Sequence, residues 1–196
     1  QALLARNNYA LGSQITPATL NHIIPGGPFK GQSVAFWLAR TPKGLALLTH
    51  NNYALGSQIN AATLNHIIPD GKLKGQSVAF WLASHSYRGN PLEHNNSALV
   101  SQITPATLNH IVPVIPGEGL YGESVAFFLA AAHHGPEILA RNDFALLSQI
   151  TPATLNYIIL GGHYKGQSVA FWLVGDFRGR LLLLEHNNYA LVSQIT

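Results

Sequence analysis

The sequence contains neither cysteine nor methionine, and only 10% of its residues carry a charged side chain. The absence of cysteine excludes disulfides and thiolate metal sites, and it fits a reducing compartment. No apolar run approaches the length of a membrane span. Hydrophobic residues make up 47% of the chain. A composition with so many apolar and so few charged residues excludes an intrinsically disordered chain. The basic residues are scattered along the sequence, so a nucleic-acid-binding stripe is not supported.

What the chain has in abundance is repetition. The stretch NNYALGSQITPATLNHII, from Asn7 to Ile24, returns almost unchanged at Asn51, Asn95 and Asn142, and a fifth copy runs from Asn187 to Thr196. Such a fixed period predicts a repeat architecture in which each unit is stabilised mainly by its neighbours. We divide this single array into a partial unit 1–30, complete units 31–74, 75–121 and 122–165, and a partial unit 166–196. Neither end carries a distinct polar cap, and we therefore expect a piece of a longer array.

The repeats are compatible with helices or with strands. SVAFWLA, LALLTH and NNYAL can form short strands around an Asn-Asn turn, which would give a β-propeller. Helices are favoured by Thr16-Pro17, where a capping threonine precedes a proline at the first helical position. The same pair recurs at Thr104-Pro105 and Thr151-Pro152.

Two further patterns favour helices. Proline appears ahead of the Asn pair in Asn90-Pro91 and in Gly135-Pro136-Glu137, where it suits a helix start better than a paired strand. The residues Leu48, Asn52, Leu55 and Ile59 have spacings of 4, 3 and 4, typical of one helical face.

We therefore predict an all-α chain with three helices in each unit. In the first complete unit they run from Val34 to about Ala39 with Ser33 as N-cap, from near Leu45 to Ser57, and from about Ala61 to Ile68. One unit cannot bury its own apolar side chains, so stacking of equivalent helices should produce an α-solenoid.

The residues Gly31-Gln32-Ser33, Leu38-Ala39, Gly44 and Leu47-Leu48 resemble a loose ankyrin repeat. The chain departs from that pattern, because Val34 and Phe36 replace the ankyrin proline and histidine and the stretch TPATLNHII is added. The whole unit resembles the ankyrin-like helical repeats of effector proteins from intracellular bacteria. This resemblance implies a partner-binding array without catalytic residues, acting in the cytoplasm or secreted into a host cell.

Aromatic and imidazole side chains that recur in the second helix are the candidates for partner binding. They tolerate replacement, as at Ser97, so the core does not demand them. The set comprises Tyr9, Tyr53, Phe144, Tyr189, His50, His94 and His186. We expect the Asn pairs to be structural, and also Asn21, Asn65, Asn109 and Asn156, which should bond the loop that follows them. Trp37, Trp81 and Trp172, with Phe128 in the equivalent place, should serve packing.

Ten histidines do not make a metal site in this sequence. Arg6 and Arg141 replace His50 and its equivalents, and Tyr157 replaces a member of the second set, His22, His66 and His110. The adjacent His133 and His134 do not face one direction on a helix. No nucleophile–base pair and no phosphate-binding glycine loop is present, so we expect neither catalysis nor a cofactor. A non-enzymatic scaffold for a protein partner is the main hypothesis, and a β-propeller lectin with one sugar site per repeat is the alternative.

Overall fold

The computed structural model describes residues 12–85, 92, 97–115, 117, 119–185 and 189–196. These residues form α-helices and short 3-10 helices, with one isolated bridge between Ile115 and Leu120 and no strand. The all-α prediction is confirmed for this part of the chain, and the missing strands speak against the β-propeller alternative. None of the helices described there is long and apolar enough to cross a membrane.

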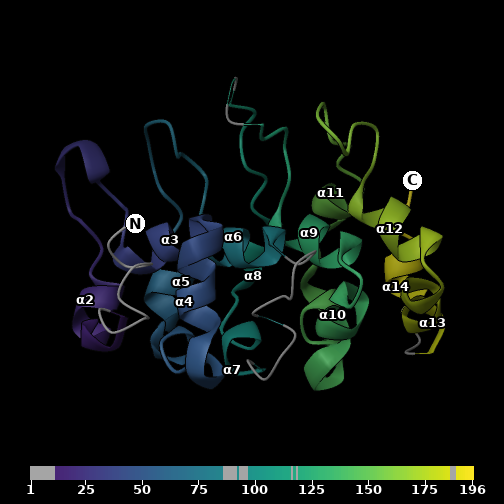
Figure 1. Cartoon of the computed structure of the whole chain (residues 1–196). Helices are drawn as coiled ribbons and strands as arrows, with labels where there is room; N and C mark the ends of the chain where they lie inside the picture. The colour runs from purple at the N-terminus through teal and green to yellow at the C-terminus, as the bar shows by residue number, and fades with distance from the viewer. Residues whose placement is uncertain (1–11, 86–91, 93–96, 116, 118, 186–188) are drawn as a thin grey trace. The chain divides into compact units, whose positions relative to one another are not determined.

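The chain divides into two compact units, Gln1–Ile103 and Thr104–Thr196, which we describe separately (Figure 1). The helices of unit 1 are η1 (Gly12–Gln14), α2 (Pro17–Asn21), η2 (Gly27–Phe29), α3 (Val34–Arg40), α4 (Pro42–Tyr53), η3 (Gly56–Gln58), α5 (Ala61–Asn65), α6 (Val78–Ser84) and α7 (Ser97–Val100). Those of unit 2 are α8 (Pro105–Asn109), α9 (Val125–Ala131), α10 (Gly135–Phe144), η5 (Leu147–Gln149), α11 (Pro152–Leu155), α12 (Val169–Gly175), α13 (Phe177–Glu185) and α14 (Tyr189–Val192).

The first helix of each repeat begins where the sequence predicts. The hydroxyl of Ser33 accepts a hydrogen bond from the Phe36 backbone N–H at 3.1 Å and so caps α3. Ser77, Ser124 and Ser168 cap α6, α9 and α12 in the same way. A capping hydroxyl satisfies a backbone N–H that has no partner within the helix.

Proline also starts helices as expected. Thr16 caps α2, which begins at Pro17, and Thr104 and Thr151 do the same for α8 and α11. Asn60 replaces threonine at the start of α5, and its side chain accepts from Thr63 N at 2.9 Å. Helix α10 begins at Gly135 and carries Glu137 in its first turn, as the Pro136 pattern predicts. Pro91 lies outside the described residues.

The second and third helices differ from their predicted bounds. Helix α4 begins at Pro42 and ends at Tyr53, and the chain continues through a 3-10 turn. Leu55 and Ile59 are nevertheless buried, so the spacing identifies the apolar face correctly but not the helix end. Helix α5 stops at Asn65 instead of Ile68, because the backbone of His66 is extended and Ile68 N donates to Gln76 O at 2.9 Å.

That pairing closes the neck of a projecting loop. Gly75 N donates to Ile68 O at 2.8 Å, and the equivalent bonds join Ile24 to Gly31 and Gln32. In unit 1 the two resulting loops stand side by side (Figure 1), and an ion pair between Lys30 and Asp70 at 3.0 Å joins them. Each repeat therefore presents one loop beside the N-terminus of its short first helix.

Four equivalent asparagines, Asn21, Asn65, Asn109 and Asn156, form an asparagine ladder. Asn21 Nδ2 donates to Gln58 O at 2.8 Å, while Asn21 Oδ1 accepts from Asn60 N at 2.9 Å. Nδ2 also donates to Pro17 O at 2.8 Å in its own helix. The amides therefore have a structural role, but our expected acceptor was wrong: they bond the next repeat instead of the loop that follows. Asn109 and Asn156 repeat the pattern in unit 2, and Asn65 Nδ2 donates to Gln102 O at 2.6 Å in unit 1.

Equivalent first helices pack on each other inside each unit, α3 on α6 and α9 on α12. This packing contributes to the burial of the phenylalanine of the first helix. Phe36 and Phe127, each followed by a further first helix in its unit, are 2% and 1% exposed. Phe171 on α12 is 53% exposed. Phe80 on α6, which no further first helix follows in unit 1, is also only 1% exposed, so the neighbouring first helix is not the sole source of burial for this residue.

Candidate functional site

Only one of the proposed partner residues has a described side chain. His50 lies exposed on α4. Tyr53, Phe144 and Tyr189 have helical backbone in α4, α10 and α14, while their side chains are outside the described set. Tyr9, His94 and His186 lie outside the described residues altogether. Their role in binding stays a prediction.

The tryptophans occupy half-buried positions, and hydrogen bonds hold the two in unit 1. Trp37 Nε1 on α3 donates to Gln32 Oε1 at 2.9 Å. In the next repeat Trp81 Nε1 donates to Gln76 Oε1 at 3.1 Å, and Gln76 itself is fully buried. The glutamine directly precedes the capping serine, so the end of the loop and the start of the helix together fix the indole. The amide oxygen of Gln76 thus orients the indole, while its Nε2 has no hydrogen-bond partner among the described residues.

Arg40 lies between the two indoles. Its guanidinium carbon is 5.4 Å from the ring centroid of Trp37 and 5.6 Å from that of Trp81, within the range of cation–π attraction. The ring of His85 follows at 6.0 Å from that of Trp81, with an interplanar angle of 31°. We name these four residues the Trp–Arg row. All four are half-buried, so the row forms part of the surface of unit 1.

Unit 2 does not reproduce the row. Phe128 replaces tryptophan on α9, is 8% exposed, and has the ring of Tyr164 at 6.2 Å. Glu123 replaces the glutamine and accepts from Tyr121 N at 2.7 Å instead. The two replacements fit each other, because phenylalanine has no N–H for the glutamine carbonyl to accept.

Sequence reasoning assigned the tryptophans to packing and missed Arg40 and the glutamines. The joint loss of glutamine and tryptophan in one repeat was the signal that could have revealed the Gln–Trp pair. No sequence pattern indicates the contact of Arg40 with Trp81, because arginine does not recur at this position. The other repeats have Ser84, Ala131 and Gly175 there.

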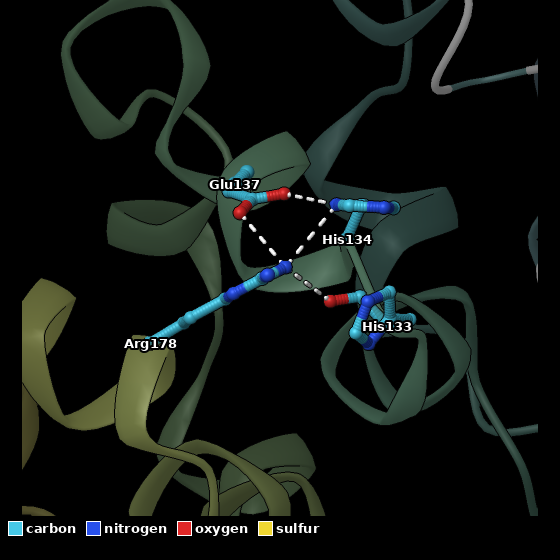
Figure 2. A network of polar contacts seen from close by, with 4 residues as sticks. All are labelled: His133, His134, Glu137 and Arg178. Atoms are coloured by element: carbon cyan, nitrogen blue, oxygen red, sulfur yellow. Dashed lines mark hydrogen bonds and ion pairs between the residues drawn. The ribbon is translucent and has the colours of Figure 1, made fainter.

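A second polar cluster joins α10 to α13 in unit 2 (Figure 2). Arg178 Nη1 lies 3.0 Å from Glu137 Oε1 and 3.1 Å from the carbonyl oxygen of His133. His134 Nδ1 lies 2.8 Å from Glu137 Oε2 and 3.2 Å from Arg178 Nη1. A single ring nitrogen cannot donate to the carboxylate and accept from the guanidinium at the same time, so the tautomer of His134 decides which contact is a hydrogen bond.

This cluster is an exposed group of ion pairs that links α10 to α13. The Arg178, His134 and Glu137 side chains are 39%, 46% and 47% exposed, and ion pairs at such positions contribute about 0.2–1 kcal/mol. The imidazole of His133 takes no part in these polar contacts and packs edge-on against that of His134, with ring centroids 4.5 Å apart (Figure 2). No group of three or more potential metal ligands occurs among the residues that the structure describes.

In the second set of histidines, His66 packs against Gly31 at the start of its own repeat unit. A Cβ on Gly31 would lie 3.1 Å from His66 Nε2 and 3.0 Å from Pro69 Cδ, so the glycine makes room for both. The Nε2 atoms of His66 and His110 are buried and have no hydrogen-bond partner among the described residues. Burial lowers the pKa of both imidazoles below the ordinary 6.5, because desolvation disfavours the charged form.

Comparison with known proteins returned no matching family model, curated relative or solved structure. Function is therefore inferred from the geometry of the chain itself.

Proposed function

We propose that the chain is a non-enzymatic α-solenoid that binds a protein partner along the surface of its stacked first helices. The observation that carries this proposal is the Trp–Arg row, in which side chains from α3 and α6 form one continuous, half-exposed surface. Tryptophan and arginine are the residues most enriched among the energetic centres of protein interfaces. A surface built from equivalent helices extends with each repeat, which suits an elongated partner segment.

The way each unit is held together supports the solenoid. The asparagine ladder connects each repeat to the next through backbone groups, and equivalent helices cover one another's apolar faces. A stacked array is longer than a globule of equal chain length. Small-angle X-ray scattering should therefore give a radius of gyration above the roughly 16 Å expected for a compact domain of this size. A value at that compact limit would contradict the solenoid.

The binding role is tested by peptide selection. A random peptide display library is selected on the full chain, and the enriched peptides are measured against wild type and against Trp37→Ala. We expect at least a few-fold weaker binding by the variant with unchanged helical circular dichroism, because truncating an interface tryptophan typically costs more than 1 kcal/mol. The matched control is Trp172→Ala in unit 2, which lies outside the row. Equal binding by wild type and Trp37→Ala would assign the partner to another surface.

The predicted tyrosine surface is a second candidate for the same role. Helices α4 and α14 carry Tyr53 and Tyr189 at equivalent places in the repeat. Replacing both by alanine should weaken partner binding with little loss of helicity. A collapse of helicity would instead identify these side chains as core residues.

A further inference from the structure

The two units differ in charge in a way that the net charge of the whole chain conceals. Residues 1–103 contain seven Lys or Arg and two Asp or Glu side chains, a formal charge of +5. Residues 104–196 contain four and six, a formal charge of −2. A unit with so few carboxylates creates a positive potential that attracts acidic molecules to one part of the chain.

Much of this charge lies on the two loops of unit 1. Lys72 and Lys74 are exposed and have no ion-pair partner among the described residues, while Lys30 is paired with Asp70. Phe29, 53% exposed, lies beside Lys30 at the end of η2. These exposed amines and the exposed aromatic ring lie on two loops joined by the Lys30–Asp70 ion pair, a combination that attracts carboxylates and can bury an apolar side chain.

The Trp–Arg row adds a cation near the necks of these loops, because Gln32 and Gln76, which bond its indoles, also pair with Ile24 and Ile68. Indole rings lie on both sides of the Arg40 guanidinium, and both rings are fixed by glutamine side chains. A guanidinium beside aromatic rings keeps its positive charge and attracts carboxylates. The rings also displace water from beside the charge, which strengthens its attraction for an anion.

We propose that the partner segment is an acidic polypeptide, rich in Asp and Glu with interspersed aromatic residues, and that it binds unit 1 over the loop lysines and the Trp–Arg row. This inference rests on the proposed function and names the chemistry of the partner. Single-stranded nucleic acid is the competing anion. It binds by stacking bases on open aromatic faces, whereas Arg40 and His85 already occupy ring faces of the row.

The test uses the full chain and fluorescence anisotropy at low salt. The probe is a labelled peptide of alternating Glu and Tyr, compared with a peptide of alternating Lys and Tyr and with a thymidine oligonucleotide of the same length. Of the three probes, we expect only the Glu-Tyr peptide to bind. Its affinity should fall as salt is added, because the contacts are ionic.

Charge reversal, with a matched control, tests whether the Glu-Tyr peptide binds over the loop lysines of unit 1. The double variant Lys72→Glu, Lys74→Glu should weaken binding of the Glu-Tyr peptide by about tenfold, since two exposed ion pairs are converted into repulsions. Lys165→Glu changes the lysine of unit 2 that is equivalent to Lys74, is equally exposed, and should leave the affinity unchanged. Unchanged folding is verified by circular dichroism for each variant.

Three outcomes would overturn the inference: no binding of the Glu-Tyr peptide, tighter binding of the oligonucleotide, or equal losses from both charge reversals. Failure of the inference is distinguishable from failure of the proposed function. A chain that ignores the acidic probe but selects neutral or basic peptides through Trp37 retains its scaffold role and refutes only the acidic partner.

Discussion

The side-chain amide of Asn109 donates to the backbone carbonyl oxygen of Gln149 at 2.7 Å and accepts from the backbone N–H of Thr151 at 2.8 Å. One amide group thus satisfies both a donor and an acceptor of the following repeat, where a 3-10 turn gives way to a helix. Backbone groups at such a junction have no helical partners. The relationship explains why asparagine stands at the end of the third helix.

Replacing Asn109 by alanine should lower the free energy of unfolding by about 2 kcal/mol, since two hydrogen bonds between repeats are lost at roughly 1 kcal/mol each. Urea unfolding followed by circular dichroism measures the change. The matched control is Asn60→Thr, which installs the capping residue used at Thr16 and Thr104 and should be nearly neutral. If the two variants are equally stable, the ladder does not hold the repeats together.

For Gly44→Ala, helix propensity and tertiary packing predict opposite changes in the free energy of unfolding. A Cβ at this position would collide with the backbone carbonyl oxygen of Leu38, where α4 crosses α3. Helix propensity alone predicts that Gly44→Ala stabilises the protein by up to about 1 kcal/mol. We expect a destabilisation of about 1–3 kcal/mol instead, because the helices must separate.

Gly175→Ala is the control for this crossing. Gly175 ends α12, and a Cβ there would meet nothing within 4 Å. Its replacement should be neutral or slightly stabilising in a thermal melt. A stabilising Gly44→Ala would mean that α4 does not approach α3 as closely as described.

The Gln–Trp pair predicts unequal effects of one substitution at two equivalent sites. Trp81→Phe removes the donor to Gln76 Oε1 and leaves a fully buried amide oxygen without its partner, at a cost of about 1–3 kcal/mol. Trp172 Nε1 has no hydrogen-bond partner among the described residues, so Trp172→Phe should cost less. Differential scanning fluorimetry ranks the two variants. A larger loss at Trp172 is the result that would count against the hydrogen bond.

Stability should depend on pH through His66 and His110. Their pKa values are lowered in the folded state, so the unfolded chain binds more protons between the lowered values and 6.5. The contribution of these residues is fully present above 6.5 and is lost as pH falls through the lowered pKa values. Urea midpoints measured between about pH 7.5 and 5 should therefore decrease toward acid.

Substitution identifies the histidines responsible for this dependence. His66→Tyr combined with His110→Tyr installs the residue found naturally at Tyr157 and should flatten the pH profile. His22→Tyr changes the equivalent but exposed histidine and serves as the control. An unflattened profile in the double variant would assign the pH dependence to other groups.

Sequence patterns located the starts of helices because their causes are local. Ser33 bonds an N–H three residues away, and Pro17 restricts its own backbone, so neither depends on distant parts of the chain. Helix ends were placed less well. Asn65 ends α5 while bonding Gln102, and Ile68 leaves the helix to pair with Gln76, and no local pattern contains those partners.

The sequence by itself determined the repeat, the helical class and the capping residues, because the same short-range interactions recur in every copy. Only the tertiary structure decided that Asn21 bonds Gln58, that Arg40 lies between Trp37 and Trp81, and that Gly44 has no room for a side chain. These relationships join separate helices, often from successive repeats. Packing distances between helices set them, and a one-dimensional pattern does not contain those distances.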